Sequence, residues 1–544
     1  MLIFDYFRKT YVIKRNRYSN TIEMRKILVS LLAVFTTLSM MGSDGYTGAT
    51  TSTSATKKTA AKTGVRAGNK KGYNIEISVS KMHNDTVFLA YYMNGKTYSC
   101  DTTVLNAKGV GKFSKPEKLD EGIYIVYFNA NKYFDLLIGQ DQDIKLTVDT
   151  AKVNEYKVDG ASESVDFQRY FSFLGDMNKQ RRELRDKYHK MKIDSAEYYG
   201  TIDKMTEKVE AHQKSILDAH NNDFLGAYIK GTMPVETPLM ENLPDSVRGR
   251  ARYQYFKHHY FDNINMSDRR FLRTPYYPSM VDEYISHHIL QDPDTLVDAA
   301  FNMIEKSRGD SLTFQVMTSK MINYGISSKM MGMDKMWYMI AEKYYFSGIA
   351  TWADTAWVNT LKKEAKKIRY CMIGMPARDL LVRDSTDAFE KLSKQTADVV
   401  LVYFFEPSCG HCRHTTPILH DTVYSKYKDK GFEVFAVYTQ TDRQEWMDFV
   451  HKHHLEDWVN VWDPYRESWF WEYYDTSATP ALYLLGKDRK IIAKKIDTNT
   501  LDMILNEELI VRKGLDKKAD KVEQTNSSNN SKKNSKSTKT KKSR

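Results

Sequence analysis

Two cysteines, Cys409 and Cys412, enclose a glycine and a histidine in the tetrapeptide Cys-Gly-His-Cys. The thiolate is the nucleophile in disulfide exchange, and a thiol one helical turn away can attack the mixed disulfide and release the partner. The spacing predicts a redox-active dithiol in which Cys409 attacks and Cys412 resolves. Such a pair carries out its chemistry with its own sulfur atoms, so we expect no cofactor and no metal.

Two neighbouring residues are candidates for tuning this pair. His411, when protonated, would stabilise the Cys409 thiolate and favour the dithiol form, which places the reduction potential between about −270 and about −120 mV. Glu406 precedes Cys409 by three residues. It is interpreted either as a proton-transfer group or as a loop residue, and both interpretations stay open.

The dithiol needs a strand and a helix to position it. Residues 399–405 form an apolar run of strand length, and residues 409–427 have the pattern of a helix. A cysteine at the start of a helix faces unpaired backbone N–H groups and the positive end of the dipole, which favour the thiolate. Further elements are predicted as strands at 432–439, 481–485 and 490–496, and as helices at 442–453 and 499–512.

These elements and several prolines resemble the thioredoxin fold, in particular the TlpA/ResA-like thiol–disulfide oxidoreductases of the bacterial envelope. The matching motifs are Gly374-Met375-Pro376, the Cys-x-x-Cys, Pro417 and Thr479-Pro480. The resemblance implies that Pro417 kinks the active-site helix. It also implies that Thr479-Pro480 is a cis pair that lies against the dithiol and presents backbone groups to a substrate chain.

One residue departs from this family. Thioredoxins keep a buried acid in the strand six residues before the first cysteine, where it helps to move protons from the resolving thiol. Tyr403 occupies that position in this chain. The route by which Cys412 loses its proton is therefore not the one that the resemblance implies.

The chain is predicted to be multidomain, because 544 residues exceed what one core supports. Residues 73–160 alternate apolar and polar side chains and predict a small antiparallel β domain, and residues 161–370 predict a mainly α-helical domain. Residues 371–512 predict the C-terminal α/β thioredoxin-like fold. The first 370 residues more weakly resemble multidomain envelope relatives with a β and a helical domain before the thioredoxin domain.

The two ends of the chain predict its location. Residues 1–43 contain a basic segment, an apolar run and small residues, which predict a secretory signal after an N-terminal extension. Residues 44–72 are predicted to be a flexible linker, and residues 513–544 a disordered basic tail. We therefore expect the periplasm or another extracytoplasmic envelope compartment of a bacterium, with no stable membrane span after signal cleavage.

The composition limits the classes of partner that are expected. The formal charge is +12, but the excess of Lys and Arg lies in the end segments and defines no binding face, so no nucleic-acid partner is expected. Four cysteines exclude a disulfide-built scaffold, and we expect Cys100 and Cys371 to be separate free thiols. The predicted partners are protein thiols and disulfides of the envelope and an unidentified electron-donor or acceptor protein.

Other functions fit parts of the sequence. The β and helical domains could make the chain a non-catalytic binding scaffold, although a scaffold has no need of both thiols. A peroxiredoxin-like enzyme shares the fold core, but its cysteine motif is missing. A zinc site at the dithiol lacks a second ligand pair. The aromatic residues that precede Pro480 are expected to pack the core rather than to line a groove, namely Trp458, Trp462, Trp469, Phe470 and Trp471.

Overall fold

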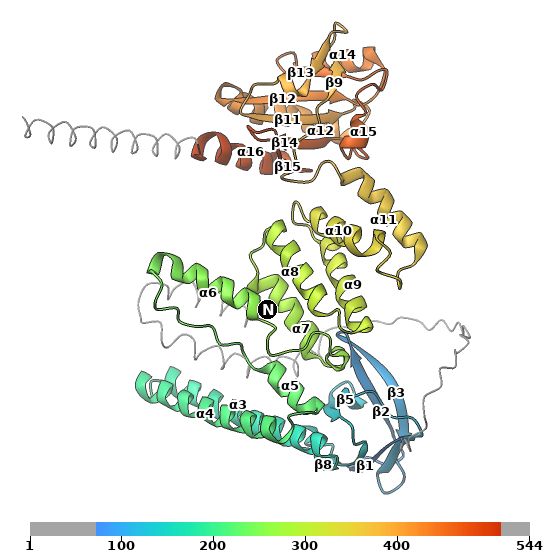
Figure 1. The fold of residues 1–544 in the computed structure, drawn as a ribbon, viewed down its shortest axis with the longest axis vertical. Helices are drawn as coiled ribbons and strands as arrows, with labels where there is room; N and C mark the ends of the chain where they lie inside the picture. Colours follow the sequence, from blue (N-terminus) through green and yellow to red (C-terminus); the bar gives the residue numbers. More distant parts are fainter. Residues whose placement is uncertain (1–71, 513–544) are drawn as a thin grey trace, which may run out of the picture. The chain divides into compact units, whose positions relative to one another are not determined.

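The computed structural model describes residues 72–512 (Figure 1). The predicted signal segment, the linker up to residue 71 and the basic tail lie outside the described residues. The described chain divides into two compact units. The first contains residues up to 291 together with 302–317, and the second contains residues 292–301 together with those from 318 onward.

The first unit begins with two four-stranded sheets within residues 73–160, ordered β4-β1-β7-β8 and β3-β2-β5-β6. The predicted alternation is confirmed, because Tyr73, Ile75, Ile77 and Val79 are buried in the core of this β region. The strands are β1 (Tyr73–Ser80), β2 (Thr86–Met93), β3 (Lys96–Val104), β4 (Val110–Lys115), β5 (Gly122–Asn129), β6 (Lys132–Ile138), β7 (Asp143–Asp149) and β8 (Lys157–Gly160).

The prediction of an antiparallel domain needs one correction, since β1 and β7 pair in parallel. The alternation of apolar residues tells which face of a strand is buried, but it does not tell the direction of its neighbour. Strand β3 is mostly exposed and polar, so its sequence lacks an apolar face.

Helices follow the β region in the first unit: α3 (Ser162–His189), α4 (Ser195–Ala219), α5 (Phe224–Thr232), α6 (Asp245–His259) and α7 (Tyr276–Glu283). The buried carboxylate of Glu163 joins these helices to the β region. It accepts the backbone N–H groups of Phe224 and Leu225 at the start of α5, and that of Gln140 after β6. An acid at a helix N-terminus satisfies donors that would otherwise lack partners.

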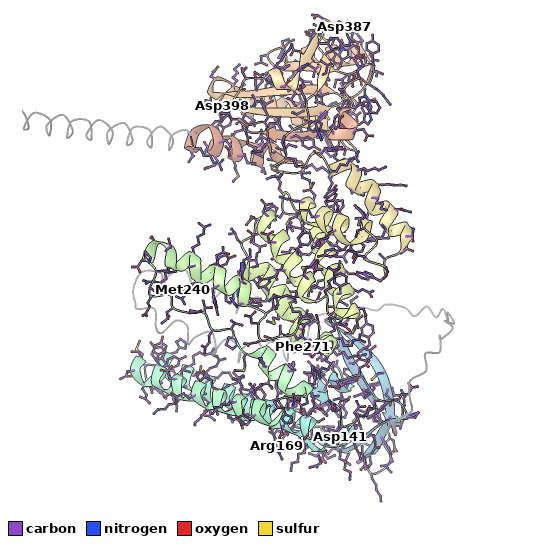
Figure 2. The ribbon with its side chains drawn as sticks, viewed as in Figure 1. Asp141, Arg169, Met240, Phe271, Asp387 and Asp398 are labelled. Carbon is purple, nitrogen blue, oxygen red and sulfur yellow. The ribbon has the colours of Figure 1, made fainter. Side chains whose placement is uncertain are left out.

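Seven strands form one sheet within residues 381–494 of the second unit, in the order β10-β9-β13-β12-β11-β14-β15. They are β9 (Leu381–Arg383), β10 (Phe389–Lys391), β11 (Val399–Phe405), β12 (Phe432–Tyr438), β13 (Val459–Trp462), β14 (Ala481–Leu485) and β15 (Ile491–Lys494). Figure 2 labels Asp387, between β9 and β10, and Asp398, which directly precedes β11. The multidomain fold class is confirmed, with β sheets, a helical middle region and a C-terminal thioredoxin-like sheet.

Strand β11 is the centre of this sheet. It pairs in parallel with β12 and antiparallel with β14, and all seven of its residues are buried. Tyr403 and Phe405 belong to the core on one face, whereas Val402 and Phe404 belong to the core on the other. A strand covered on both faces explains the continuous apolar run in the sequence.

The helices of the second unit include α10 (Asp334–Ile340), α11 (Thr355–Ile368), α12 (Gly410–Ile418), α13 (Ser425–Tyr427), α14 (Arg443–Lys452), α15 (Phe470–Tyr473) and α16 (Thr498–Asn506). The unit boundary crosses α8 (Pro293–Lys306) and α9 (Ser311–Ser327). Among residues 72–512, no helix combines the length and apolar character needed to cross a bilayer.

The helical domain predicted at 161–370 does not coincide with one of the two compact units. Its last segment, from residue 318 onward, belongs to the second unit together with the seven-stranded sheet. Lys494 of β15 is buried, forms an ion pair with Asp334 of α10, and donates to the backbone oxygen of Cys371 at 2.9 Å. A buried ammonium group requires such partners. The helical pattern of the sequence does not reveal which core a helix joins.

Candidate active site

The Cys-x-x-Cys lies where the buried strand β11 passes into helix α12. Cys409 is the residue before the first helical position, and the helix continues through Cys412 to Ile418. The strand and the start of the helix confirm the predicted arrangement. Both cysteines are free thiols, so the structure represents the dithiol form of the pair.

Cys409 lies in surroundings that favour its thiolate. Its Sγ is half-buried and contacts the backbone oxygen of Thr479 at 3.2 Å. Partial burial opposes ionisation, but the backbone N–H groups of Cys412 and His411 and the Thr479 side chain outweigh it, which lowers the pKa of Cys409 to about 7. Donors at the start of a helix therefore make Cys409 the nucleophile at neutral pH.

Cys412 lies one turn further along α12, and its surroundings have the opposite effect. Its side chain is fully buried in the same core as Tyr403. Burial raises the pKa of Cys412 to about 12, although hydrogen bonds with the Glu406 backbone and the Thr479 side chain oppose the shift. Cys412 is thus a protonated, protected thiol, as a resolving cysteine must be until a mixed disulfide forms.

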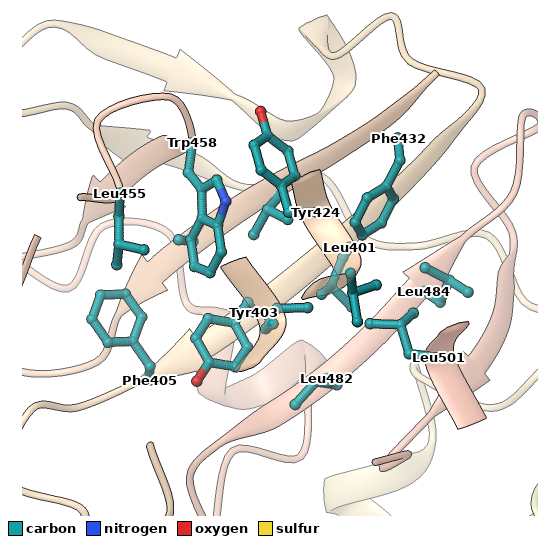
Figure 3. Close-up of a cluster of buried hydrophobic side chains, with 14 of the residues drawn as sticks. Leu401, Tyr403, Phe405, Tyr424, Phe432, Leu455, Trp458, Leu482, Leu484 and Leu501 are labelled. Carbon is teal, nitrogen blue, oxygen red and sulfur yellow. The ribbon is translucent and has the colours of Figure 1, made fainter. Parts of the chain in front are cut away.

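Tyr403 lies behind this turn, where the resemblance places an acid. Its ring lies among apolar side chains that include Phe405, Trp458 and Leu482 (Figure 3). Its hydroxyl is hydrogen-bonded to the Thr416 hydroxyl at 2.8 Å, and both residues are buried. Burial raises the pKa of Tyr403 well above its ordinary value, so the phenol stays neutral. Two neutral hydroxyl groups occupy the space of the expected carboxylate.

The loop before β14 closes the site. The Thr479–Pro480 peptide bond is cis, as the resemblance implied. The Thr479 hydroxyl donates to the Glu406 carboxylate at 3.0 Å, and the side-chain amide of Gln440 donates to the other Glu406 oxygen at 2.8 Å. Glu406 is therefore joined to the dithiol through Thr479, while the role of Thr479-Pro480 in presenting a substrate stays a prediction.

His411 lies between the two cysteines, and the tuning of the pair by its imidazole stays a prediction. Its side chain is exposed, and its backbone N–H is the part that contributes to the lowered pKa of Cys409. Sequence reasoning also missed Thr416 and Gln440, which hold Tyr403 and Glu406. Neither forms a recognisable motif, because each acts through a contact that is formed only in the folded chain.

The aromatic residues before Pro480 divide into two groups. Trp458, Trp462 and Phe470 are buried, as expected for core residues. Trp469 is 57% exposed and Trp471 is half-buried. Trp471 packs against the core, so the expectation of core packing holds for four of these five residues. It fails for Trp469, which follows a loop and has a left-handed backbone conformation with φ of 55°.

The remaining candidates do not add a second site. Cys100 and Cys371 are free thiols, as predicted. Cys371 is buried, and the Tyr483 hydroxyl lies 3.7 Å from its sulfur. Across the described part of the chain, no three His, Cys, Asp or Glu side chains converge in a way that could hold a metal ion.

Comparison with known families identifies two parts of the chain. Residues 397–491 match the model of a family described as thioredoxin-like, and residues 191–374 match a domain of unknown function, DUF5106. The thioredoxin-like match contains β11, the dithiol and the cis Thr479–Pro480 bond. No curated protein matches the chain.

Three solved structures illustrate what the chain is similar to. One is a domain of a possible thiol-disulfide isomerase from Cytophaga hutchinsonii, at 33% identity over 27% of this chain and 97% of that one, with a TM-score of 0.25. A thioredoxin-like protein from Bacteroides caccae matches at 21% identity over 50% and 97%, with a TM-score of 0.36. The thioredoxin domain of a thiol-disulfide oxidoreductase from Bacteroides vulgatus matches at 25% identity over 25% and 97%, with a TM-score of 0.24.

The fold and the opposed environments of the two cysteines define an oxidoreductase of the thioredoxin type. Through this C-terminal domain the chain belongs to the thioredoxin-like family. It differs from the pattern expected of thioredoxins in having Tyr403 and Thr416 behind the dithiol.

Proposed function

We propose that the protein is an envelope thiol–disulfide oxidoreductase that exchanges disulfides with partner proteins through Cys409 and Cys412. The observation that carries this proposal is the placement of the pair, with Cys409 half-buried at the start of α12 and Cys412 fully buried one turn later. This difference in burial supports attack by the accessible Cys409 thiolate and resolution by the buried Cys412 thiol.

The exchange proceeds through a mixed disulfide. The Cys409 thiolate attacks one sulfur of a partner disulfide, and the other partner sulfur leaves as a thiolate. Cys412 then attacks Cys409, which forms the internal disulfide and releases the second partner thiol. The reverse sequence oxidises a partner dithiol, and the direction depends on the potential of the electron-donor or acceptor protein.

The envelope location rests on the signal-like segment in residues 1–43, which lies before the described residues. Disulfides persist in that compartment, so an exchange enzyme has substrates there. The relatives named as thiol-disulfide oxidoreductases and isomerases in Bacteroides and Cytophaga support the proposed activity.

The test is to trap partners in cells. Replacing Cys412 with alanine removes the resolving thiol, so mixed disulfides should accumulate on Cys409 and disappear on reduction. The matched Cys409→Ala variant should trap none. Absence of trapped species in Cys412→Ala, together with absence of insulin reduction by the wild type, would contradict the proposed function.

A further inference from the structure

The loop between α15 and β14 lies against the nucleophile. The backbone oxygen of Thr479 in this loop is 3.2 Å from the Cys409 sulfur. A partner sulfur has to approach Cys409 to react, so the chain next to the partner cysteine passes along the loop. Ser477 and Ala478 are exposed, which leaves the outer side of the loop open to such a chain. The position of the loop should therefore matter more for a polypeptide disulfide than for a small one.

The carboxylate of Asp475 holds the start of this loop. Asp475 is buried, and one of its oxygens forms an ion pair with Lys495, the residue directly after the edge strand β15. Its other oxygen accepts the hydroxyl of Ser477 at 2.6 Å and the backbone N–H of the same residue at 3.3 Å. A buried carboxylate that loses its partners is costly unless the chain around it moves. The ion pair therefore ties the conformation of the loop to the sheet.

The backbone of Asp475 is held by the sheet as well. The hydroxyl of Tyr483 in β14 accepts the Asp475 backbone N–H at 2.8 Å and donates to the Asp475 backbone oxygen at 3.2 Å. Tyr483 is fully buried, and its strand pairs with β11. Because Cys409 follows β11, one pair of neighbouring strands positions both the loop and the nucleophile.

The two ends of the loop are thus held differently. Thr479 at the far end donates its hydroxyl to the half-buried carboxylate of Glu406. Asp475 at the near end is buried and has contacts from both its carboxylate and its backbone. A change at Asp475 should therefore displace the loop, and with it the Thr479 oxygen beside Cys409.

We propose that Asp475 is a positioning residue for exchange with polypeptide disulfides, because it fixes the loop that places Thr479 beside Cys409. This inference rests on the proposed function and concerns the attack on the partner. In that step the Cys409 sulfur bonds to one partner sulfur, and the bond between the two partner sulfurs breaks. The other partner sulfur leaves as a thiolate with that electron pair. Asp475 acts on this step only through the backbone of the loop.

The experiment compares two oxidants of the reduced full chain. Oxidised insulin supplies a polypeptide disulfide, and dithiobis(nitrobenzoate) supplies a small one that has no peptide chain to lie along the loop. The reaction is stopped with acid, the remaining thiols are alkylated, and the peptide that contains Cys409 and Cys412 is measured by mass spectrometry. A series of insulin concentrations gives a maximum rate and a half-saturating concentration.

Asp475→Asn removes the charge that pairs with Lys495. The ratio of maximum rate to half-saturating concentration for insulin should fall at least about tenfold, mainly through the half-saturating concentration, because a displaced loop misplaces the partner. The rate with dithiobis(nitrobenzoate) should stay within about twofold of the wild-type rate, since the thiolate itself is unchanged.

Changes at Lys495 test the same ion pair from its other side. The Lys495 side chain is 55% exposed, so Lys495→Met should fold even if Asp475→Asn does not. It should weaken the reaction with insulin in the same way, and Lys495→Arg should keep most of it. The double variant of Asp475→Asn with Lys495→Met should be no slower than the slower single variant, because both changes break one contact.

A matched control removes an ion pair of the same kind elsewhere in the second unit. Asp502 pairs with Lys426 at 2.7 Å, and Asp502→Asn should change the rate with neither oxidant. Urea unfolding of each variant, followed by tryptophan fluorescence, shows that the second unit is folded in the assay.

Three results would overturn the inference. The first is unchanged insulin kinetics in Lys495→Met or in folded Asp475→Asn. The second is an equal loss with both oxidants, since the ion pair would then support only the fold. The third is a double variant whose effects multiply. A wild-type dithiol that insulin does not oxidise would instead count against the proposed function, which requires exchange with polypeptide disulfides.

Discussion

The two ends of the first turn of α12 differ more than their separation of three residues suggests. At one end Cys409 is half-buried and surrounded by N–H donors, so its pKa falls to about 7. At the other end Cys412 enters the core beside Tyr403, and burial raises its pKa to about 12. The same chemical group thus becomes a nucleophile or a protected thiol according to what its sulfur touches.

A strand and a helix are enough to make Cys409 the nucleophile and Cys412 the protected thiol. The helix provides donors at its first residues, and the strand provides an apolar surface one turn later. No charged side chain behind Cys412 is needed for this division, because Tyr403 and Thr416 close the space as neutral groups. The departure from the thioredoxin pattern affects proton transfer rather than the choice of nucleophile.

The largest expected effect is the contrast in alkylation between the two thiols. With the other cysteine of the pair replaced by alanine, Cys409 should react about 10⁴ times faster than Cys412 at about pH 8, since the thiolate fractions follow pKa values of about 7 and about 12. Below pH 7 the Cys409 rate should fall about tenfold per pH unit. Iodoacetamide rates read by mass spectrometry check this. Alkylation rates of Cys409 and Cys412 within tenfold of each other would contradict the predicted difference between the two thiols.

The next largest effect is on stability, when the uncharged Tyr403 side chain behind Cys412 is replaced. Tyr403→Asp places a carboxyl group in the core and removes a ring that stacks on Phe405. The free energy of unfolding of the second unit should therefore fall by about 3 kcal/mol or more. The matched Tyr403→Phe change removes one hydrogen bond and should cost about 1 kcal/mol.

Tryptophan fluorescence during urea unfolding measures this in the full chain. All eight tryptophans lie between Trp337 and Trp471, so the signal reports the second unit. Equal stability of the Asp and Phe variants would mean that the space behind Cys412 is hydrated, contrary to its burial.

The smallest effect separates the backbone of His411 from its imidazole. His411→Gln keeps the N–H group and should leave the Cys409 pKa almost unchanged. His411→Pro removes that donor and should raise the pKa by about one unit, the effect of one hydrogen bond to a charged group. Thiolate absorbance against pH distinguishes the two variants, and a large shift of the Cys409 pKa in the Gln variant would show that the imidazole tunes the pair, as the sequence predicts.

Much of the site could be predicted because its parts are local in sequence or follow a known motif. The run before Glu406 predicts a buried strand, and the spacing of Cys409 and Cys412 predicts a helix start. Thr479-Pro480 could be placed beside the dithiol through the resemblance. By contrast, the Glu406–Thr479 contact joins residues 73 positions apart, and no pattern within either segment predicts it.

The fold shows the same limit. Alternation predicts β1 correctly, but it cannot predict that β1 runs parallel to β7, because direction depends on how the intervening strands are shared between sheets. Helical periodicity predicts the helices up to residue 370 without telling which unit they join. The ion pair of Lys494 with Asp334 links such a helix to the C-terminal sheet, and it is formed by two ordinary charged residues.

The reduction potential of the Cys409–Cys412 pair is the most direct test of the central claim that this dithiol is catalytic. The full chain is equilibrated with glutathione buffers, and the free thiols are then alkylated and counted. We expect a two-electron couple between about −270 and about −120 mV, the range of exchange enzymes. A pair that stays oxidised until below about −300 mV would behave as a structural disulfide and would contradict the account.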